Sequence, residues 1–308
     1  MASSRTDYTQ YCSELASRGY IVAAIEHRDG SCPASLVMGS DGATKTVYSM
    51  SVNQLKKSPI LDTGVETAEL KEMQLAMRQA EVEETIRVLR MINAGEGSKI
   101  SRDNPRREGK TLETWRGRID FDHLAVGGHS YGATLALQTL KGGPSKSLPI
   151  QGAIILDPGK QSGPLNDDIN VPTMVIHSNS WSSKHSIFFG RPHFDVVKDL
   201  VEGVARRGKA AWFMTSLGTS HPSVTDAPII EPLLLSWTTG STIDVKEGVH
   251  QYVKATVEFM DFLKSGLRTG ILAEPVTHPV YDEADRNETN HQMVSGDISR
   301  YWQIHVAP

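Results

Sequence analysis

Short apolar runs alternate along the chain with longer amphipathic stretches. Continuous apolar runs are typical of strands that are buried on both faces, as in a parallel sheet. Four runs have this character: Tyr20–Glu26, Gly152–Leu156, Pro172–His177 and Ala210–Met214. Helical spacing of apolar residues marks the segments Asp7–Ser17, Glu66–Asn93, Phe194–Gly203 and Val249–Leu263. Strands that alternate with helices predict an α/β fold with a mostly parallel sheet flanked by helices.

The segments between these elements differ in character. Residues 27–60 carry several glycines and prolines, and we expect a long irregular excursion that covers or lines a site. Residues 95–117 are charged and polar, which indicates a surface loop. Met73 and Met77, within the long helix, are expected to fill the core. We expect one α/β domain over residues 1–270, followed by a polar, loosely packed tail over residues 271–308.

The chemistry centres on the stretch LAVGGHSYGATLAL, residues 124–137. An apolar run ends at Gly127, Ser130 lies between Gly128 and Gly132, and an apolar, helix-favouring run follows. This is the context in which G-x-S-x-G forms a nucleophile elbow, a strained turn between a strand and a helix. Glycines two positions before and after the serine are expected because side chains there would collide with neighbouring elements. Ser130 is therefore the predicted nucleophile.

A serine hydroxyl needs an adjacent base, and the base needs an orienting acid. Asp157 follows the run Gly152–Leu156 directly, and the carboxyl ends of parallel strands share one edge of a sheet. Asp157 is therefore the predicted acid. The other carboxylates in this part of the chain are interpreted as solvated charges: Asp167, Asp168, Asp195 and Asp199.

The chain has 11 histidines, and the order Ser–Asp–His leaves only those after the acid. His221 stands in a loop just past the last parallel strand and is the predicted base. His177 is the main rival because it also ends a strand. His185 and His193 could line a pocket, and His129, beside the nucleophile, is interpreted as structural.

Composition excludes several classes of function. A net charge of −4 without a long basic run argues against nucleic acid as the main partner. Two cysteines support neither a disulfide framework nor a zinc site, and no H-E-x-x-H motif occurs, so no metal or cofactor is expected. The sequence shows no long apolar span and no signal-like apolar segment, which predicts a cytoplasmic protein.

Three segments together resemble one family. The stretch LASRGYIVAAIEHRD, residues 15–29, resembles a signature of the platelet-activating-factor acetylhydrolases of the group VII, calcium-independent phospholipase A2 type. Gly128–Gly132 resembles that family's nucleophile motif, although Ala133 stands in place of a second glycine. Leu156–Asp157 resembles the segment of its acid, and Gly218–His221 that of its histidine, with Asp226 five residues further on as in the family.

The resemblance implies an α/β-hydrolase fold and a metal-independent serine esterase that cleaves the sn-2 short or oxidised acyl ester of phospholipids. On this reading Ser130 attacks, His221 transfers the proton, and Asp157 fixes the histidine tautomer. The backbone N–H of Tyr131 would stabilise the oxyanion. The implied partner is a phospholipid substrate, with transient contact to a membrane surface through Ile187–Phe189 and Ile229–Trp237.

The family pattern also includes strands upstream of this chain and a His-Gly-Leu-Gly-Gly-Ser loop that supplies an oxyanion donor. Residues 1–6 resemble the end of that loop. We therefore expect a chain truncated at its N-terminus, with the first strands of the fold missing. Two alternatives to the phospholipid esterase stay open: an inactive truncated relative, and a general carboxylesterase or lipase.

Overall fold

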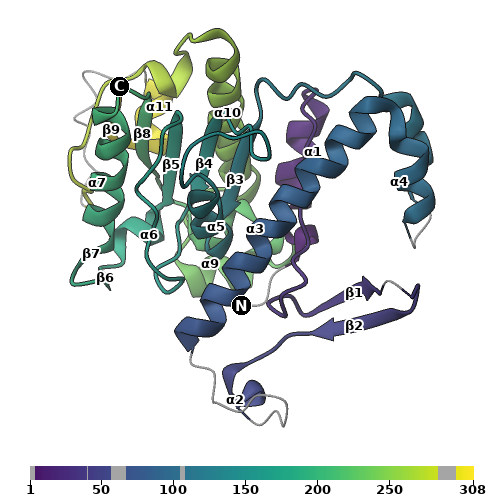
Figure 1. Ribbon diagram of the computed structural model, residues 1–308. Coiled ribbons are helices and arrows are strands. Elements are labelled where there is room, and N and C mark those ends of the chain that lie inside the picture. The colour runs from purple at the N-terminus through teal and green to yellow at the C-terminus, as the bar shows by residue number, and fades with distance from the viewer. Residues whose placement is uncertain (1–3, 40, 57–66, 105–107, 284–295) are drawn as a thin grey trace. The chain divides into compact units, whose positions relative to one another are not determined.

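The computed structural model of the protein describes residues 4–39, 41–56, 67–104, 108–283 and 296–308 (Figure 1). The chain divides into two compact units, and each is described here by itself. One consists of Met1–Asp7, Ile21–Phe121 and Lys146–Leu148. The other consists of Tyr8–Tyr20, Asp122–Ser145 and Pro149–Pro308, and it holds the predicted site.

A five-stranded sheet forms the centre of the larger unit. Its order is β3-β4-β5-β8-β9, with neighbours parallel except for the last pair, in which β9 runs antiparallel to β8. The strands are β3 (Ala125–His129), β4 (Gly152–Leu156), β5 (Thr173–Ser178), β8 (Ala211–Ser216) and β9 (Trp302–Val306). The predicted α/β fold with a mostly parallel sheet is confirmed, because the three apolar runs after residue 150 form β4, β5 and β8.

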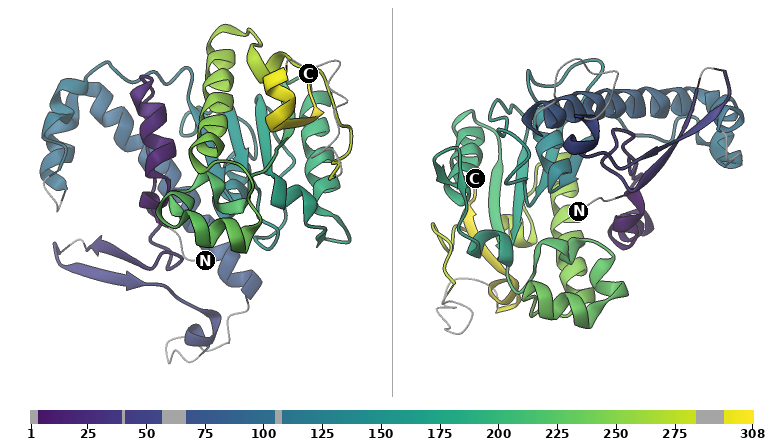
Figure 2. Two further views of the ribbon diagram at one scale, coloured as in Figure 1. Left: turned by 180° about the vertical axis from the view of Figure 1, so that it is seen from behind. Right: turned by 90° about the horizontal axis from the view of Figure 1, so that it is seen from below.

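Helices cover both faces of this sheet. Helix α10 (Val245–Ser265) packs on one face, where Phe259 meets Trp212 and Met214 of β8 in the main core cluster. Helices α5 (Tyr131–Thr139) and α7 (His193–Arg206) pack on the opposite face, as the front view of Figure 1 and the rear view of Figure 2 show. Burial on both faces explains the apolar runs at the centres of β4, β5 and β8.

Helix α1 (Thr9–Ser17) lies against α10 and is tied to the loop after the predicted histidine. Leu15 packs on α10, and the Tyr11 hydroxyl bonds to Thr256 Oγ1 at 2.7 Å. The Asp226 carboxylate accepts hydrogen bonds from the backbone N–H groups of Thr9 and Gln10, both at 2.9 Å. Because first-turn N–H groups have no partner inside a helix, Asp226 caps α1 from more than 200 residues away in the sequence.

Short elements complete the larger unit. They are α6 (Asn179–Ser183), β6 (Ile187–Phe188), β7 (Arg191–Pro192), η4 (His221–Val224), α8 (Ala227–Ile230), α9 (Pro232–Thr239), η5 (Gly270–Ala273) and α11 (Gly296–Tyr301). The 3₁₀ turn η1 (Arg5–Tyr8) precedes α1. In the described part of the chain, no helix is long and apolar enough to cross a bilayer.

The C-terminal residues differ from the loosely packed tail that we expected. Residues 302–306 form β9, the last strand of the main sheet, and all five are buried. Ile304 joins the core cluster, and the Trp302 indole donates to Gln251 Oε1 of α10 at 3.0 Å. The polar character of the preceding segment concealed a five-residue strand, because one short apolar run at a chain end is a weak sequence signal.

The smaller unit contains a hairpin and helices. Its elements are β1 (Ala34–Met38), β2 (Thr44–Tyr48), α2 (Val52–Leu55), α3 (Thr67–Met91), the π-helical turn η2 (Ile92–Glu96), α4 (Gly97–Asp103) and η3 (Lys110–Trp115). The long helix is confirmed over its described residues. The predicted surface loop over residues 95–117 is wrong in part, because α4 and η3 occupy much of it. Gly95, at φ 101°, turns the chain between α3 and α4.

The E-H-R-D stretch that carried the family resemblance is bound to α3 by charged groups. Arg78 Nε lies 2.6 Å from Asp29 Oδ2, and both side chains are buried. Burial raises the pKa of Asp29, but the Arg78 guanidinium and the Ser31 hydrogen bonds outweigh it and leave the pKa below its usual value. Glu81 accepts from both His27 Nδ1, at 2.7 Å, and Arg28 Nε, at 2.9 Å. The charged residues of this stretch therefore have a structural role, because they attach it to α3 within this unit.

Val82 and Ile86 are buried, as their spacing predicts, but these pairs add polar residues to the buried side of α3. Gln74, Arg78 and Glu81 are buried, whereas the side chains of Met73 and Met77 are 59% and 41% exposed. The expectation that these methionines fill the core is wrong. The physical reason is that the polar groups of residues 27–31 need buried partners on α3, and charged residues at helical spacing supply them.

The apolar run Tyr20–Glu26 does not form the predicted strand. Among the described residues it pairs with no strand, and Ile21 and Val22 are 41% and 38% exposed. An extended segment becomes a strand only where a neighbour supplies ladder hydrogen bonds. Hydrophobic pattern predicts the tendency to pair but not the presence of a partner.

Three histidines are buried where β5, β9 and α7 meet. His177, His193 and His305 are each at most 2% exposed, and the His177 ring stacks on His193 with centroids 5.6 Å apart. Burial lowers the pKa of His193 and of His305 to about 4 and that of His177 well below its usual value. The folded protein therefore holds this cluster in the neutral form.

We predict that the unfolding free energy begins to fall at pH values well above the pKa range of carboxylates. From about pH 6.5 downward the unfolded chain binds protons that the folded cluster excludes. Each histidine that stays neutral then costs about 1.4 kcal/mol of unfolding free energy per pH unit, until the pH reaches its folded pKa. Urea denaturation at a series of pH values from neutral to mildly acidic measures this slope.

The slope should fall in a His305→Gln variant, which keeps a hydrogen-bonding side chain but cannot bind the proton. His185→Gln, a change at an exposed histidine, is the matched control and should leave the slope unchanged. An unfolding free energy that is independent of pH across this interval would contradict neutral burial of the cluster.

Candidate active site

Ser130 occupies a sharp turn between β3 and α5. Its backbone has φ 58° and ψ −118°, a conformation that is costly for a residue with a side chain and that is typical of strained functional sites. The Ser130 N–H donates to the Leu156 carbonyl of the neighbouring strand at 3.0 Å, which anchors the turn at the carboxyl edge of the sheet. Tyr131 follows at once as the first residue of α5.

The two flanking glycines are not equivalent. A Cβ at Gly128 would collide with the backbone carbonyl of Gly132 in the first turn of α5. A Cβ at Gly132 would meet no atom within 4 Å. The expected steric need for glycine therefore holds at Gly128 and is wrong at Gly132, because only the position before the serine faces the helix backbone.

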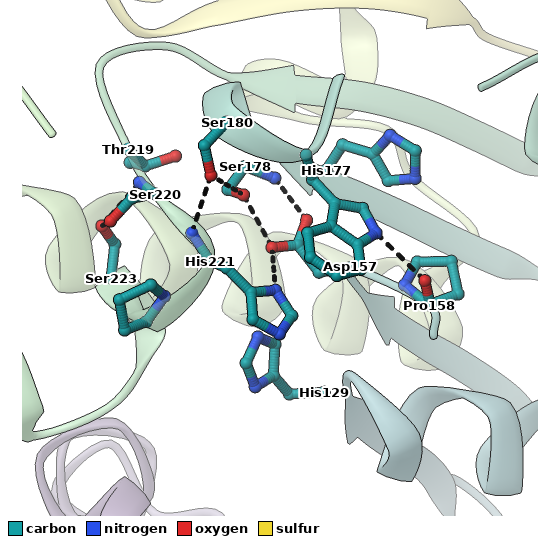
Figure 3. Close-up of polar contacts among 12 residues, drawn as sticks. His129, Asp157, Pro158, His177, Ser178, Ser180, Thr219, Ser220, His221 and Ser223 are labelled. Atoms are coloured by element: carbon teal, nitrogen blue, oxygen red, sulfur yellow. Dashed lines mark hydrogen bonds and ion pairs between the residues drawn. The ribbon is translucent and has the colours of Figure 1, made fainter. Parts of the chain in front are cut away.

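Asp157 lies at the end of β4, on the same sheet edge, and is almost fully buried. It also has a positive φ, 47°. Ser178, at the end of β5, donates its backbone N–H to Oδ1 and its hydroxyl to Oδ2, both at 2.6 Å. His221 Nδ1 lies 2.8 Å from the same Oδ2 (Figure 3). Three hydrogen bonds therefore fix the position of the carboxylate.

His221 begins the turn η4, in the loop that follows β8. Its backbone N–H donates to Ser180 Oγ at 3.0 Å, and Ser220 and Ser223 form a capping box around the turn. The imidazole stacks on the Trp181 indole with ring centroids 4.0 Å apart and an interplanar angle of 11°. Backbone and ring contacts together hold the histidine with Nδ1 toward Asp157.

His129, the residue before the serine, faces the His221 ring, and their centroids are 4.4 Å apart (Figure 3). Its Nδ1 lies 2.8 Å from the Tyr8 hydroxyl, whereas its Nε2 is buried without a hydrogen-bond partner among the described residues. Burial, followed by the neighbouring His221, lowers the pKa of His129 to about 3, although the nearby Asp157 carboxylate acts in the opposite direction. His129 is therefore neutral.

The structure brings some of the predicted residues together and keeps others apart. Asp157 contacts His221, and the rival His177 points into the core, where its ring meets Phe213. Ser130 ends the strand beside that of Asp157, but no hydrogen bond joins its hydroxyl to His221 in the described part of the chain. The other candidate carboxylates are all exposed: Asp167, Asp168, Asp195 and Asp199.

Sequence reasoning missed Ser178, Trp181 and Lys160. Ser178 had a usable signal, since it ends a parallel strand next to the strand of Asp157. Lys160 Nζ donates to the backbone carbonyls of Trp181 and Lys184 at 2.8 and 3.0 Å and lies 4.5 Å over the Trp181 ring. Burial lowers the pKa of Lys160 to about 8. No sequence pattern marks the contacts of Trp181 and Lys160, because they arise from loops that meet only in the fold.

Comparison with solved structures supports the fold. Ferulic acid esterase from Streptomyces cinnamoneus matches with a TM-score of 0.51 at 18% sequence identity, over 89% of this chain and 68% of that one. At this identity the likeness concerns the fold alone. Together with the mostly parallel sheet and the turn at Ser130, it shows the predicted α/β-hydrolase fold.

Curated relatives match at modest identity. The platelet-activating factor acetylhydrolase of Canis lupus familiaris is 33% identical over 136 residues, which is 44% of this chain and 29% of that protein. The protein of that name from Gallus gallus is 26% identical over 186 residues, covering 58% and 42%. The matched part thus spans less than half of either relative.

The family-level comparison covers more of the chain. The sequence profile of the family described as platelet-activating factor acetylhydrolase, isoform II, matches residues 1–269, which include the elbow, Asp157, His221 and the E-H-R-D stretch. The chain therefore belongs to the platelet-activating factor acetylhydrolase, isoform II, family.

Proposed function

We propose that this chain is a serine esterase that hydrolyses the sn-2 ester of phospholipids with a short or oxidised acyl chain. The observation that carries the proposal is the shared sheet edge of Ser130 and the Asp157–His221 pair, with the serine in a strained elbow. Family membership supports the substrate class. The arrangement of acid and histidine supports the reaction type.

In the proposed reaction Ser130 Oγ attacks the ester carbonyl while His221 Nε2 takes its proton. His221 then gives that proton to the departing lysolipid oxygen, and water releases the acyl group by the same steps in reverse. Asp157 keeps the proton of the neutral histidine on Nδ1 and stabilises the imidazolium. The stacked Trp181 ring adds a cation–π contribution to that charged form.

The proposed oxyanion donor on this chain is the backbone N–H of Tyr131, at the start of α5. Amide groups in a first helical turn point along the positive end of the helix dipole, where developing negative charge is favoured. The mechanism also requires Ser130 Oγ to approach His221 more closely on substrate binding. Catalytic hydrogen bonds are often long in a free enzyme and tighten in the substrate complex.

A general carboxylesterase is the second candidate, because the ferulic acid esterase likeness concerns the fold but leaves the substrate open. Substrate comparison separates the two. The phospholipid proposal requires a higher kcat/KM for an sn-2 acetyl phospholipid than for a simple aryl ester. The opposite ranking would favour the general esterase, and no hydrolysis of either by folded protein would favour the inactive relative.

We further propose transient contact with a phospholipid surface through two exposed apolar groups. Ile187 and Phe189 are 63% and 72% exposed, and Phe188 between them is buried. Leu233 and Trp237, on α9, are each 86% exposed. The buried position of Phe188 moves the expected contact to its two neighbours.

For the triad, we predict that Ser130→Ala and His221→Gln each lower kcat by roughly 10⁵–10⁶-fold and Asp157→Asn by roughly 10⁴-fold. His177→Gln should keep most of the activity, because His177 lies in the core and not at Asp157. Initial rates on the sn-2 acetyl phospholipid measure these effects in protein with an unchanged circular dichroism spectrum. EDTA should not reduce the wild-type rate. An inactive His177→Gln beside an active His221→Gln would overturn the assignment.

For the surface contact, we predict that Phe189→Asp and Leu233→Asp each weaken binding to phosphatidylcholine vesicles about tenfold or more, since interfacial binding scales with the inserted apolar area. Leu267→Asp is the matched control, because Leu267 is also largely exposed, at 67%, but lies on another segment. Vesicle co-sedimentation measures the effect. Equal binding of all four proteins would show that the exposed groups do not contact the lipid.

A further inference from the structure

Two histidine rings in the site share an unusual arrangement of ring nitrogens. His221 Nδ1 bonds to the Asp157 carboxylate and His129 Nδ1 to the Tyr8 hydroxyl, both at 2.8 Å. His129 Nε2 is buried without a hydrogen-bond partner among the residues that the structure describes, and His221 Nε2 is the ring nitrogen that does not bond to Asp157. The ring centroids lie 4.4 Å apart (Figure 3), so the two Nε2 atoms belong to neighbouring rings.

The Nδ1 partners decide which nitrogens carry protons. A carboxylate only accepts, so the proton of neutral His221 lies on Nδ1 and its Nε2 presents a lone pair. The Tyr8 hydroxyl can accept in the same way from His129 Nδ1, which leaves a second lone pair on His129 Nε2.

We propose that His129 and His221 bind one zinc ion through their Nε2 atoms, and that the ion inhibits the enzyme. Asp157 and Tyr8 are its outer partners: metal-bound histidines usually donate their other N–H to a carboxylate, carbonyl or water, and Asp157 matches this pattern. One potential ligating atom from each of His129, Asp157 and His221 lies within 4.8 Å of the others. Binding requires the imidazole rings to turn so that both Nε2 atoms reach one ion. Water completes the coordination.

Inhibition follows from the atom that the ion occupies, and this part of the inference rests on the proposed function. His221 Nε2 is the nitrogen that takes the serine proton, so a zinc ion bound there removes the base. Magnesium and calcium prefer oxygen ligands and do not compete for two imidazoles. Inhibition by zinc but not by magnesium or calcium would therefore indicate that the ligands are imidazole nitrogens.

Binding is tested first without reference to activity. Isothermal titration of the full chain with zinc chloride should show one site in the wild type. His129→Gln and His221→Gln should each abolish that site, and Tyr8→Phe should weaken it by about 10–100-fold, the usual effect of losing an outer partner. His250→Gln, a change at an exposed histidine on α10, should bind like the wild type.

No zinc binding by the wild type, or binding that His129→Gln leaves unchanged, would overturn the proposal. The first outcome is also expected if Tyr8 donates to His129 Nδ1, which would place the ring proton on Nε2. Loss of the site in His250→Gln would assign binding to surface histidines and overturn it as well.

The activity measurement separates this inference from the proposed function. Zinc should inhibit wild-type ester hydrolysis, EDTA should reverse the inhibition, and Tyr8→Phe should need about 10–100-fold more zinc for half inhibition. Zinc bound at His129 and His221 without inhibition would support the metal site and contradict His221 as the base. Normal catalysis without zinc binding would overturn the metal site alone.

Discussion

The site depends on one buried carboxylate at the edge of a parallel sheet. Asp157 receives hydrogen bonds from Ser178 on the next strand and from His221 in the loop after β8. An unpaired charge at this depth would cost several kcal/mol, so these donors are required if Asp157 is ionised. The same requirement fixes the rotamer of His221 and, through Ser178, the end of β5. Elements distant in the sequence are thereby held in one geometry.

A second set of contacts connects this edge to the beginning of the larger unit. Asp226, five residues after His221, caps α1, and Tyr8 at the start of that helix bonds to His129. The His129 ring contacts the His221 imidazole, and the Trp181 indole stacks on the same imidazole. Movement of α1 is therefore expected to change the environment of the histidine without any direct contact between α1 and Asp157.

Sequence patterns predicted the elements whose apolar character follows from local rules. The run Gly152–Leu156 forms β4 with identical limits, and the glycine-flanked serine lies in a strained turn. The contact between Asp157 and His221 also agrees with the expected strand-end placement. The catalytic roles of these residues, and of Ser130, are predictions that comparison with relatives does not test.

The errors share a physical cause, because each depends on a partner that local sequence does not specify. Tyr20–Glu26 has the composition of a buried strand but no described strand beside it. Met73 was expected in the core because methionine is apolar, yet it is exposed, whereas Arg78 is buried in an ion pair with Asp29. The stacking of Trp181 on His221 could not be predicted, because α6 and η4 are distant in the sequence and meet only in the folded chain.

Covalent labelling shows whether Ser130 is the nucleophile. A fluorophosphonate reacts with a serine only where a base activates it, so intact-mass spectrometry and peptide mapping identify the reactive residue. We expect one label per chain, on the peptide that contains Ser130, and no label in Ser130→Ala. A label on Ser178, Ser180 or any other residue, or an unlabelled chain that still hydrolyses the ester, would contradict it.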